Sequence, residues 1–99
     1  MTASSGASPR HRLPTQCFSL TAEAEPGAMS RVLEVFAKRG LVPSQWHSTL
    51  ADRHGDELQI DVQVTDIDAM LARRLAETLR QVVAVRSVLV AEKRQLLTA

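Results

Sequence analysis

A turn of proline and glycine, Pro26-Gly27, carries the clearest chemical signal in the chain, and the chemistry is the binding of a carboxylate. An amphipathic stretch with helical spacing follows the turn directly and runs to Gly40. Glycine has no side chain, and the first amides of a helix have no partners inside it, so the start of this helix is open to an anion. The sequence therefore predicts that a carboxylate can bind at the turn of Gly27.

The other reactive side chains are not spaced for chemistry. Cys17 is the only cysteine, and no histidine has metal-ligand spacing with it. The histidines are His11, His47 and His54. The acidic residues in the middle of the chain alternate between a loop and an exposed strand face, which is typical of a solvated surface. These residues are Asp52, Asp56, Glu57 and Asp61. We expect no catalytic residue, no metal and no cofactor.

Composition limits the classes of protein to consider. The chain has 99 residues and a formal net charge of +1, which leaves no broad basic surface for a nucleic acid. Residues 1–15 are polar, with no apolar run that could serve as a signal peptide or membrane anchor, so we predict a disordered leader. A single cysteine makes no disulfide framework, and a cytoplasmic location is the most economical. The domain should occupy residues 16–92, followed by a tail at 93–99.

The elements that must position the turn can be read from periodicity. Alternating apolar residues predict a strand over residues 16–22, with Phe18 on its core face. Apolar residues at helical spacing predict a helix from Ala28 to Arg39 with its buried face toward the core. The residues of that predicted buried face are Met29, Val32, Leu33 and Phe36. A second strand should span Leu41 to Leu50, and Pro43 either places it at a sheet edge or delays its start.

The second half of the chain repeats the pattern. Alternation from Leu58 to Val64 predicts a third strand with one polar face, open to solvent or to a partner. A stripe of leucines predicts a second helix, capped by Asp66 or Asp68, and residues 85–90 predict a last strand. The order β-α-β-β-α-β predicts an α+β, ferredoxin-like fold: a four-stranded antiparallel sheet with two helices on one face.

This fold serves unrelated functions, so individual residues must discriminate among them. An RNA-recognition module needs aromatic side chains on its central strands, and the predicted third strand has none. Trp46 is the only tryptophan and lies on the predicted edge strand. Tryptophan is enriched at protein interfaces, although packing against the helices is an equal alternative. We take Trp46, Pro43 and Ser44 as candidate interface residues.

A short run of residues resembles the ACT domain family, and within it the short small (regulatory) subunits of acetolactate synthase. The run is Glu25, Gly27-Ala28-Met29-Ser30-Arg31-Val32, Phe36 and Arg39-Gly40. The likeness extends over residues 16–92. It implies a non-catalytic subunit of branched-chain amino acid biosynthesis that binds a thiamine-diphosphate-dependent large subunit, raises its activity and can confer inhibition by valine. It also implies a homodimer of paired ACT domains, with an amino-acid effector at their junction. The positions that match the effector site are Gly27, Ala28 and Met29.

Two positions depart from the family pattern. Valine-binding small subunits usually carry asparagines where this chain has Ala24 and Val42. Those amides can hydrogen-bond the ammonium and carboxylate groups of the effector. We therefore expect a subunit that is weakly sensitive or insensitive to valine. The alternative is a free-standing ACT domain that binds another amino acid and regulates a different enzyme or a transcriptional response. A dimerisation module without a ligand is a third possibility.

Overall fold

The computed structural model describes residues 13–51 and 53–93. The predicted leader and tail lie largely outside these residues. The described part of the chain forms four strands and two helices, and neither helix is long and apolar enough to cross a bilayer. The elements are β2 (Thr15–Glu23), α1 (Ala28–Ala37), β3 (Gln45–Leu50), β4 (Glu57–Val64), α2 (Ala69–Arg80) and β5 (Val85–Lys93).

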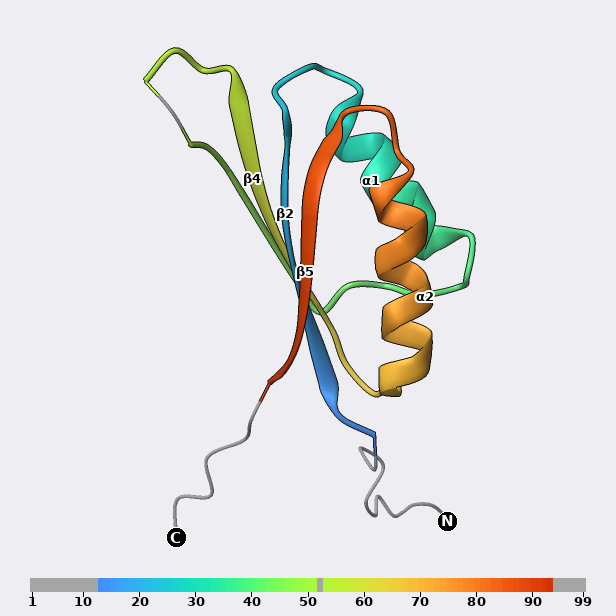
Figure 1. The fold of residues 1–99 in the computed structure, drawn as a ribbon. Coiled ribbons are helices and arrows are strands. Elements are labelled where there is room, and N and C mark those ends of the chain that lie inside the picture. The colour runs from blue at the N-terminus through green and yellow to red at the C-terminus, as the bar shows by residue number, and fades with distance from the viewer. Residues whose placement is uncertain (1–12, 52, 94–99) are drawn as a thin grey trace, which may run out of the picture.

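The strands form one antiparallel sheet in the order β3-β4-β2-β5, and both helices cover the same face of it (Figure 1). This confirms the predicted ferredoxin-like architecture. Side chains along each strand point alternately to the two faces of the sheet, and residues paired across strands point to the same face. The apolar side chains therefore gather on one face, which the helices cover. Phe18 of β2 lies between Val62 of β4 and Val90 of β5, and all three belong to the core side.

The core fills the space between the sheet and the helices. Phe36 of α1 meets Phe18 edge to face, with ring centroids 5.2 Å apart and ring planes at 76°. The quadrupoles of the two rings favour this arrangement. Leu75 and Leu79 of α2 are fully buried beside them. Other buried side chains of the core are Leu20, Val32, Ile60, Val62, Ala72 and Val88.

The buried stripe of α1 differs from the predicted one. Ala28, Val32 and Phe36 are buried, one residue in every four, which makes a narrow stripe. Met29 and Leu33 lie on the flank of that stripe and are 41% and 44% exposed. The prediction that both face the core was therefore wrong. Helical spacing alone could not distinguish a narrow stripe from a wide one, because all five residues are apolar.

The two helices begin and end differently. Asp68 caps α2, and its side chain accepts a hydrogen bond from the Leu71 amide at 2.7 Å. Asp66, the other candidate cap, lies before the helix with a φ of +62°. The helix α1 has no side-chain cap and ends at Ala37, two residues before the predicted end at Arg39. Gly40 then takes a φ of +72°, as its position after a helix predicts.

The strand β3 is shorter than the predicted span from Leu41 to Leu50. It begins at Gln45, after Pro43, and it also lies at a sheet edge. Proline has no N–H to contribute to a ladder, so the strand starts beyond it. Both predicted effects of Pro43, the edge position of the strand and its later start, are therefore present.

Candidate functional site

Gly27 shapes the turn between β2 and α1, where it is the N-cap residue of the helix. Its φ of −84° and ψ of −6° are right-handed values that any residue adopts, so the backbone does not require glycine. A Cβ atom at this position would lie 3.2 Å from Cζ and from Nη2 of Arg31. What the missing side chain provides is space, and the guanidinium of Arg31 fills it.

Arg31 is held over the turn by Glu25. Its Nη1 lies 2.6 Å from Glu25 Oε1, with the side chains 49% and 39% exposed. The first turn of α1 has no acidic residue of its own. Arg31 therefore adds positive charge to the positive end of the helix dipole, and Glu25 compensates it. The carboxylate of Glu25 is therefore the anion that this positive charge holds.

Only some of the residues predicted for the effector site lie close together. Gly27, Ala28 and Met29 form the first turn of α1, where Ala28 is fully buried and Met29 lies on the exposed flank. Ala24 is half-buried in the preceding turn and packs against the core. Val42 follows the far end of α1 and is 83% exposed. A helix of 10 residues, about 15 Å long, separates Val42 from Gly27.

The turn is braced by two neighbouring loops at the same end of the sheet. The amide of Glu23 donates to the carbonyl of Ala84, before β5, at 2.8 Å. The amide of Ala24 donates to the carbonyl of Asp56, before β4, at 3.0 Å. Backbone hydrogen bonds therefore fix where the turn leaves the sheet.

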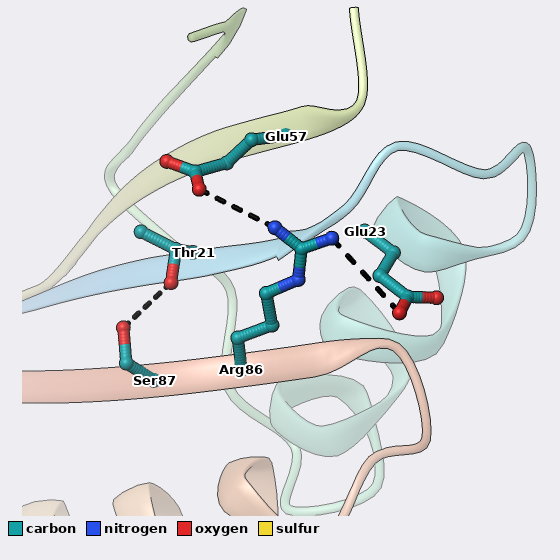
Figure 2. Close-up of polar contacts among 5 residues, drawn as sticks. All are labelled: Thr21, Glu23, Glu57, Arg86 and Ser87. Atoms are coloured by element: carbon teal, nitrogen blue, oxygen red, sulfur yellow. Dashed lines mark hydrogen bonds and ion pairs between the residues drawn. The ribbon is translucent and has the colours of Figure 1, made fainter. Parts of the chain in front are cut away.

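A β-bulge adds a side-chain brace at this end. Opposite Thr21 and Ala22, the strand β5 has one extra residue, Arg86. The bulge turns Arg86 onto the open face of the sheet, since the extra residue breaks the alternation of sides. Figure 2 shows its guanidinium between Glu57 of β4, at 3.3 Å, and Glu23 of β2, at 3.9 Å. One side chain thus links three strands.

An apolar groove of about 500 Å³ lies between α1 and β3. Its lining residues are Met29, Ser30, Leu33, Pro43 and Trp46. The Ser48 hydroxyl donates to the sulfur of Met29 at 3.3 Å and so joins the strand to the helix. Trp46 is half-buried: it packs against the core and also lines the groove. Trp46 therefore packs against the core, as one of the two alternatives predicted, and its place in an interface stays a prediction.

The predicted interface residues fall into two groups. Pro43 and Trp46 line the groove, whereas Ser44 donates its amide and its hydroxyl to the Gln63 carbonyl, at 2.7 and 3.1 Å. Sequence reasoning missed Leu33 as a groove residue, because its apolar type placed it in the core. It also missed the pair of Arg31 and Glu25, because no local spacing rule pairs residues six positions apart across a turn.

The described residues contain no candidate metal site. Within 13–51 and 53–93, no three His, Cys, Asp or Glu side chains gather in a way that could hold a metal ion. Cys17 lies half-exposed as a free thiol on the open face of the sheet. The features that remain are the uncapped turn, the ion pair over it and the apolar groove beside it.

The fold and these features define a small ligand-binding or pairing domain of the ferredoxin-like class. The chain belongs to the ACT-like domain family, whose model matches residues 10–97. ACT domains are generally regulatory and non-catalytic, and they commonly pair and bind small amino-acid effectors. No curated protein matches the chain in sequence.

Solved structures with the same fold belong to several different proteins. The ACT domain of the GTP pyrophosphokinase of Chlorobium tepidum is 14% identical, with a TM-score of 0.66 over 78% of this chain and 96% of that one. The C-terminal domain of the MgtC protein of Mycobacterium tuberculosis is 12% identical, with a TM-score of 0.67 over 88% and 94%. The regulatory subunit of aspartate kinase from Thermus thermophilus is 18% identical, with a TM-score of 0.61 over 82% and 52%. At these identities the likeness shows the fold.

Proposed function

We propose that this chain is a non-catalytic regulatory subunit that activates acetolactate synthase in the cytoplasm and responds weakly or not at all to valine. It would act as a homodimer on a thiamine-diphosphate-dependent large subunit. The observation that carries the proposal is the run from Gly27 to Gly40, which has the spelling of the small subunits and lies in the βαββαβ position that the family uses. Membership of the ACT-like family supports a regulatory role.

The weak response to valine is argued from three positions. Ala24 and Val42 offer no side-chain amide to an effector, and a polar group left unpaired in a pocket costs about 1–3 kcal/mol of affinity. Val42 is 83% exposed beyond the far end of α1. At Gly27, the ion pair of Arg31 and Glu25 takes the space that the missing side chain leaves. An effector carboxylate would have to compete with that of Glu25.

The test is reconstitution. Adding the purified chain to an acetolactate synthase large subunit should raise the rate of acetolactate formation, and titrating valine into the mixture should change that rate little. Absence of both binding and a rate change would refute the proposal. Strong inhibition by valine would leave the subunit assignment standing and refute the insensitivity.

A second candidate is favoured by the groove between α1 and β3. Its apolar lining beside a positive helix start suits a small amino acid with an apolar side chain. In this alternative, the chain is a free-standing ACT domain that governs a different enzyme or a transcriptional response. A thermal shift with one particular amino acid, absent with valine and lost in the Gly27→Asp variant, would favour it. A flat response to all twenty amino acids would count against it.

A further inference from the structure

The charges of the molecule are divided between its two layers. The helices and the two residues after α1, 28–39 and 69–80, carry six basic and two acidic residues, a formal charge of +4. The strands and loops in the rest of the described chain carry three basic and eight acidic residues, a formal charge of −5. The small net charge of the whole chain therefore conceals a basic helix layer and an acidic sheet layer. The basic residues of the helix layer are Arg31, Lys38, Arg39, Arg73, Arg74 and Arg80.

Half of these basic side chains have partners within the molecule. Two of the six form ion pairs on or beside α1, and Arg80 donates to the Val88 carbonyl at 2.8 Å. The side chains of Arg39, Arg73 and Arg74 are exposed, and none forms an ion pair or hydrogen bond with the residues that the structure describes. These three guanidinium groups are available to a partner.

The three unpaired arginines lie toward one end of the helix layer. The chain enters α1 from the end of β2 that pairs with the start of β4, and it enters α2 from the opposite end of the sheet, after β4. The helices therefore run in opposite directions, and α1 ends toward the end of the molecule where α2 begins (Figure 1). Arg39 follows α1 directly, and Arg73 and Arg74 lie in the first half of α2.

An exposed methionine lies beside the arginines of α2. Met70 is 62% exposed and precedes Arg73 and Arg74 by three and four residues, a spacing that makes side chains neighbours on a helix. All three lie outside the buried stripe of α2. Methionine and arginine are enriched at protein interfaces, and the flexible methionine side chain adapts to an irregular surface. We call Met70, Arg73 and Arg74 the α2 patch.

We infer that the α2 patch docks the regulated enzyme, which is the large subunit of the proposed function, through carboxylate side chains of that subunit arranged around Met70. A guanidinium presents parallel N–H groups that match the two oxygens of a carboxylate. Arg73 and Arg74 have no carboxylate partner among the described residues, so docking breaks no ion pair there. This inference rests on the proposed function and assigns the surface that it uses.

Charge selects this occupant over two others. A second copy, related by a two-fold axis through the patch, would bring Arg73 and Arg74 against the same arginines and be repelled. A nucleic acid is held by many phosphate contacts, whereas α2 also carries Glu77 one turn beyond the patch and the sheet layer is acidic. A protein surface with a few carboxylates and an apolar centre matches both the arginines and Met70.

Binding to a purified large subunit tests the patch. In calorimetric titrations of the full chain, the double variant Arg73→Glu, Arg74→Glu should raise the dissociation constant about tenfold or more, because two attractive contacts become repulsive. The matched control is Arg53→Glu, Lys93→Glu, which changes the net charge equally at exposed bases of the sheet layer and should bind within about twofold of wild type. Equal losses in the two double variants would show attraction without a defined surface and overturn the inference.

Salt separates the roles of the residues in the α2 patch. Binding of the wild-type chain should weaken as salt rises, and the arginine double variant should lose most of this dependence. Met70→Ser should weaken binding about threefold and keep the salt dependence, because it removes apolar contact and no charge. A salt dependence that the arginine variant retains would overturn the inference.

Two further outcomes are decisive. A short DNA duplex that binds the wild-type chain, fails to bind the arginine variant and displaces the large subunit would assign the α2 patch to nucleic acid and overturn the inference. Wild-type binding that the arginine variant retains would refute the docking surface and leave the proposed function standing. Failure of the wild-type chain to bind the large subunit would refute both.

Discussion

The two helices are stabilised at opposite ends: α2 by a side-chain cap at its start, and α1 by a glycine after its end. The helix α2 is fixed at its start, where Asp68 has the extended ψ of 166° that lets a side chain reach the amides of the first turn. The N-cap of α1 has a helical ψ of −6° and no side-chain cap, and the helix is instead terminated by Gly40 with a φ of +72°. Near the start of α1, Arg31 of the helix pairs with Glu25 of the preceding turn.

The comparison shows that α1 lacks a side-chain cap because of its backbone conformation as well as its sequence. A capping side chain needs an extended N-cap residue, and Gly27 is not extended. The Ala28 amide donates instead to the backbone carbonyl of Glu25 at 3.0 Å, and the carboxylate of Glu25 pairs with Arg31. Four substitutions test the comparison. All are read as free energies of unfolding in urea at one protein concentration, so that any self-association contributes equally to every variant.

Gly40→Ala should have the largest effect. A left-handed φ costs a residue with a Cβ about 1–2 kcal/mol, and nothing lies within 4 Å that would add a clash or a compensating contact. We expect the free energy of unfolding to fall by that amount. Gly40→Asn should lose less, because asparagine tolerates this region. Equal losses in the two variants would show that the end of α1 does not depend on backbone strain.

Asp68→Ala should lower the free energy of unfolding by about 1 kcal/mol, the usual contribution of a side-chain cap. The lost interaction is the 2.7 Å hydrogen bond from the Leu71 amide. Glu77→Ala, at an exposed position in the same helix, serves as the control and should change little. Equal free energies of unfolding for the two variants would show that the Asp68 cap does not stabilise α2.

Arg31→Gln should lower the free energy of unfolding by about 0.5 kcal/mol or less, because pairs with this much exposure are screened by water. The small loss should shrink further in high salt. The control is Lys38→Gln, whose pair with Glu34 lies within α1 at 3.9 Å. A loss well above that of the control would show that Arg31 supports the fold rather than merely covering the turn.

Gly27→Asp should have the smallest effect on stability, near zero. Its ψ prevents capping, and the added carboxylate would replace or compete with Glu25 for Arg31, whose guanidinium lies 3.2 Å from the new Cβ. A gain comparable with the loss in Asp68→Ala would mean that the turn rearranges to admit a cap. In that case the contrast between the two helix starts would rest on side-chain type alone.

Local patterns predicted most of the fold. The alternation in β4 and the leucine stripe of α2 were sufficient because strand and helix periods differ and both segments are long enough to display them. Gly40 was recognisable from its place after a helix. The family run at Gly27 pointed to the ACT fold, and its turn was found where the pattern placed it.

What could not be predicted depends on contacts between distant segments. Leu33 is apolar whether it faces the core or the groove, so only the placement of α1 relative to β3 reveals its 44% exposure. The bulge at Arg86 is a mismatch in register between β2 and β5, which neither strand shows by itself. The guanidinium of Arg31 also reaches Glu25, six positions away across the turn, and helical spacing does not describe that pair.

The neutral edge of β3 has a further consequence for a newly made chain. No Asp, Glu, Lys or Arg occurs in this edge strand, so its open backbone can accept an extended peptide, including an unfolded chain of its own kind. The other edge is guarded, since β5 carries a bulge, Glu92 and Lys93, and Arg80 of α2 donates to its Val88 carbonyl at 2.8 Å. Aggregation through a strand edge would therefore begin at β3 rather than at β5.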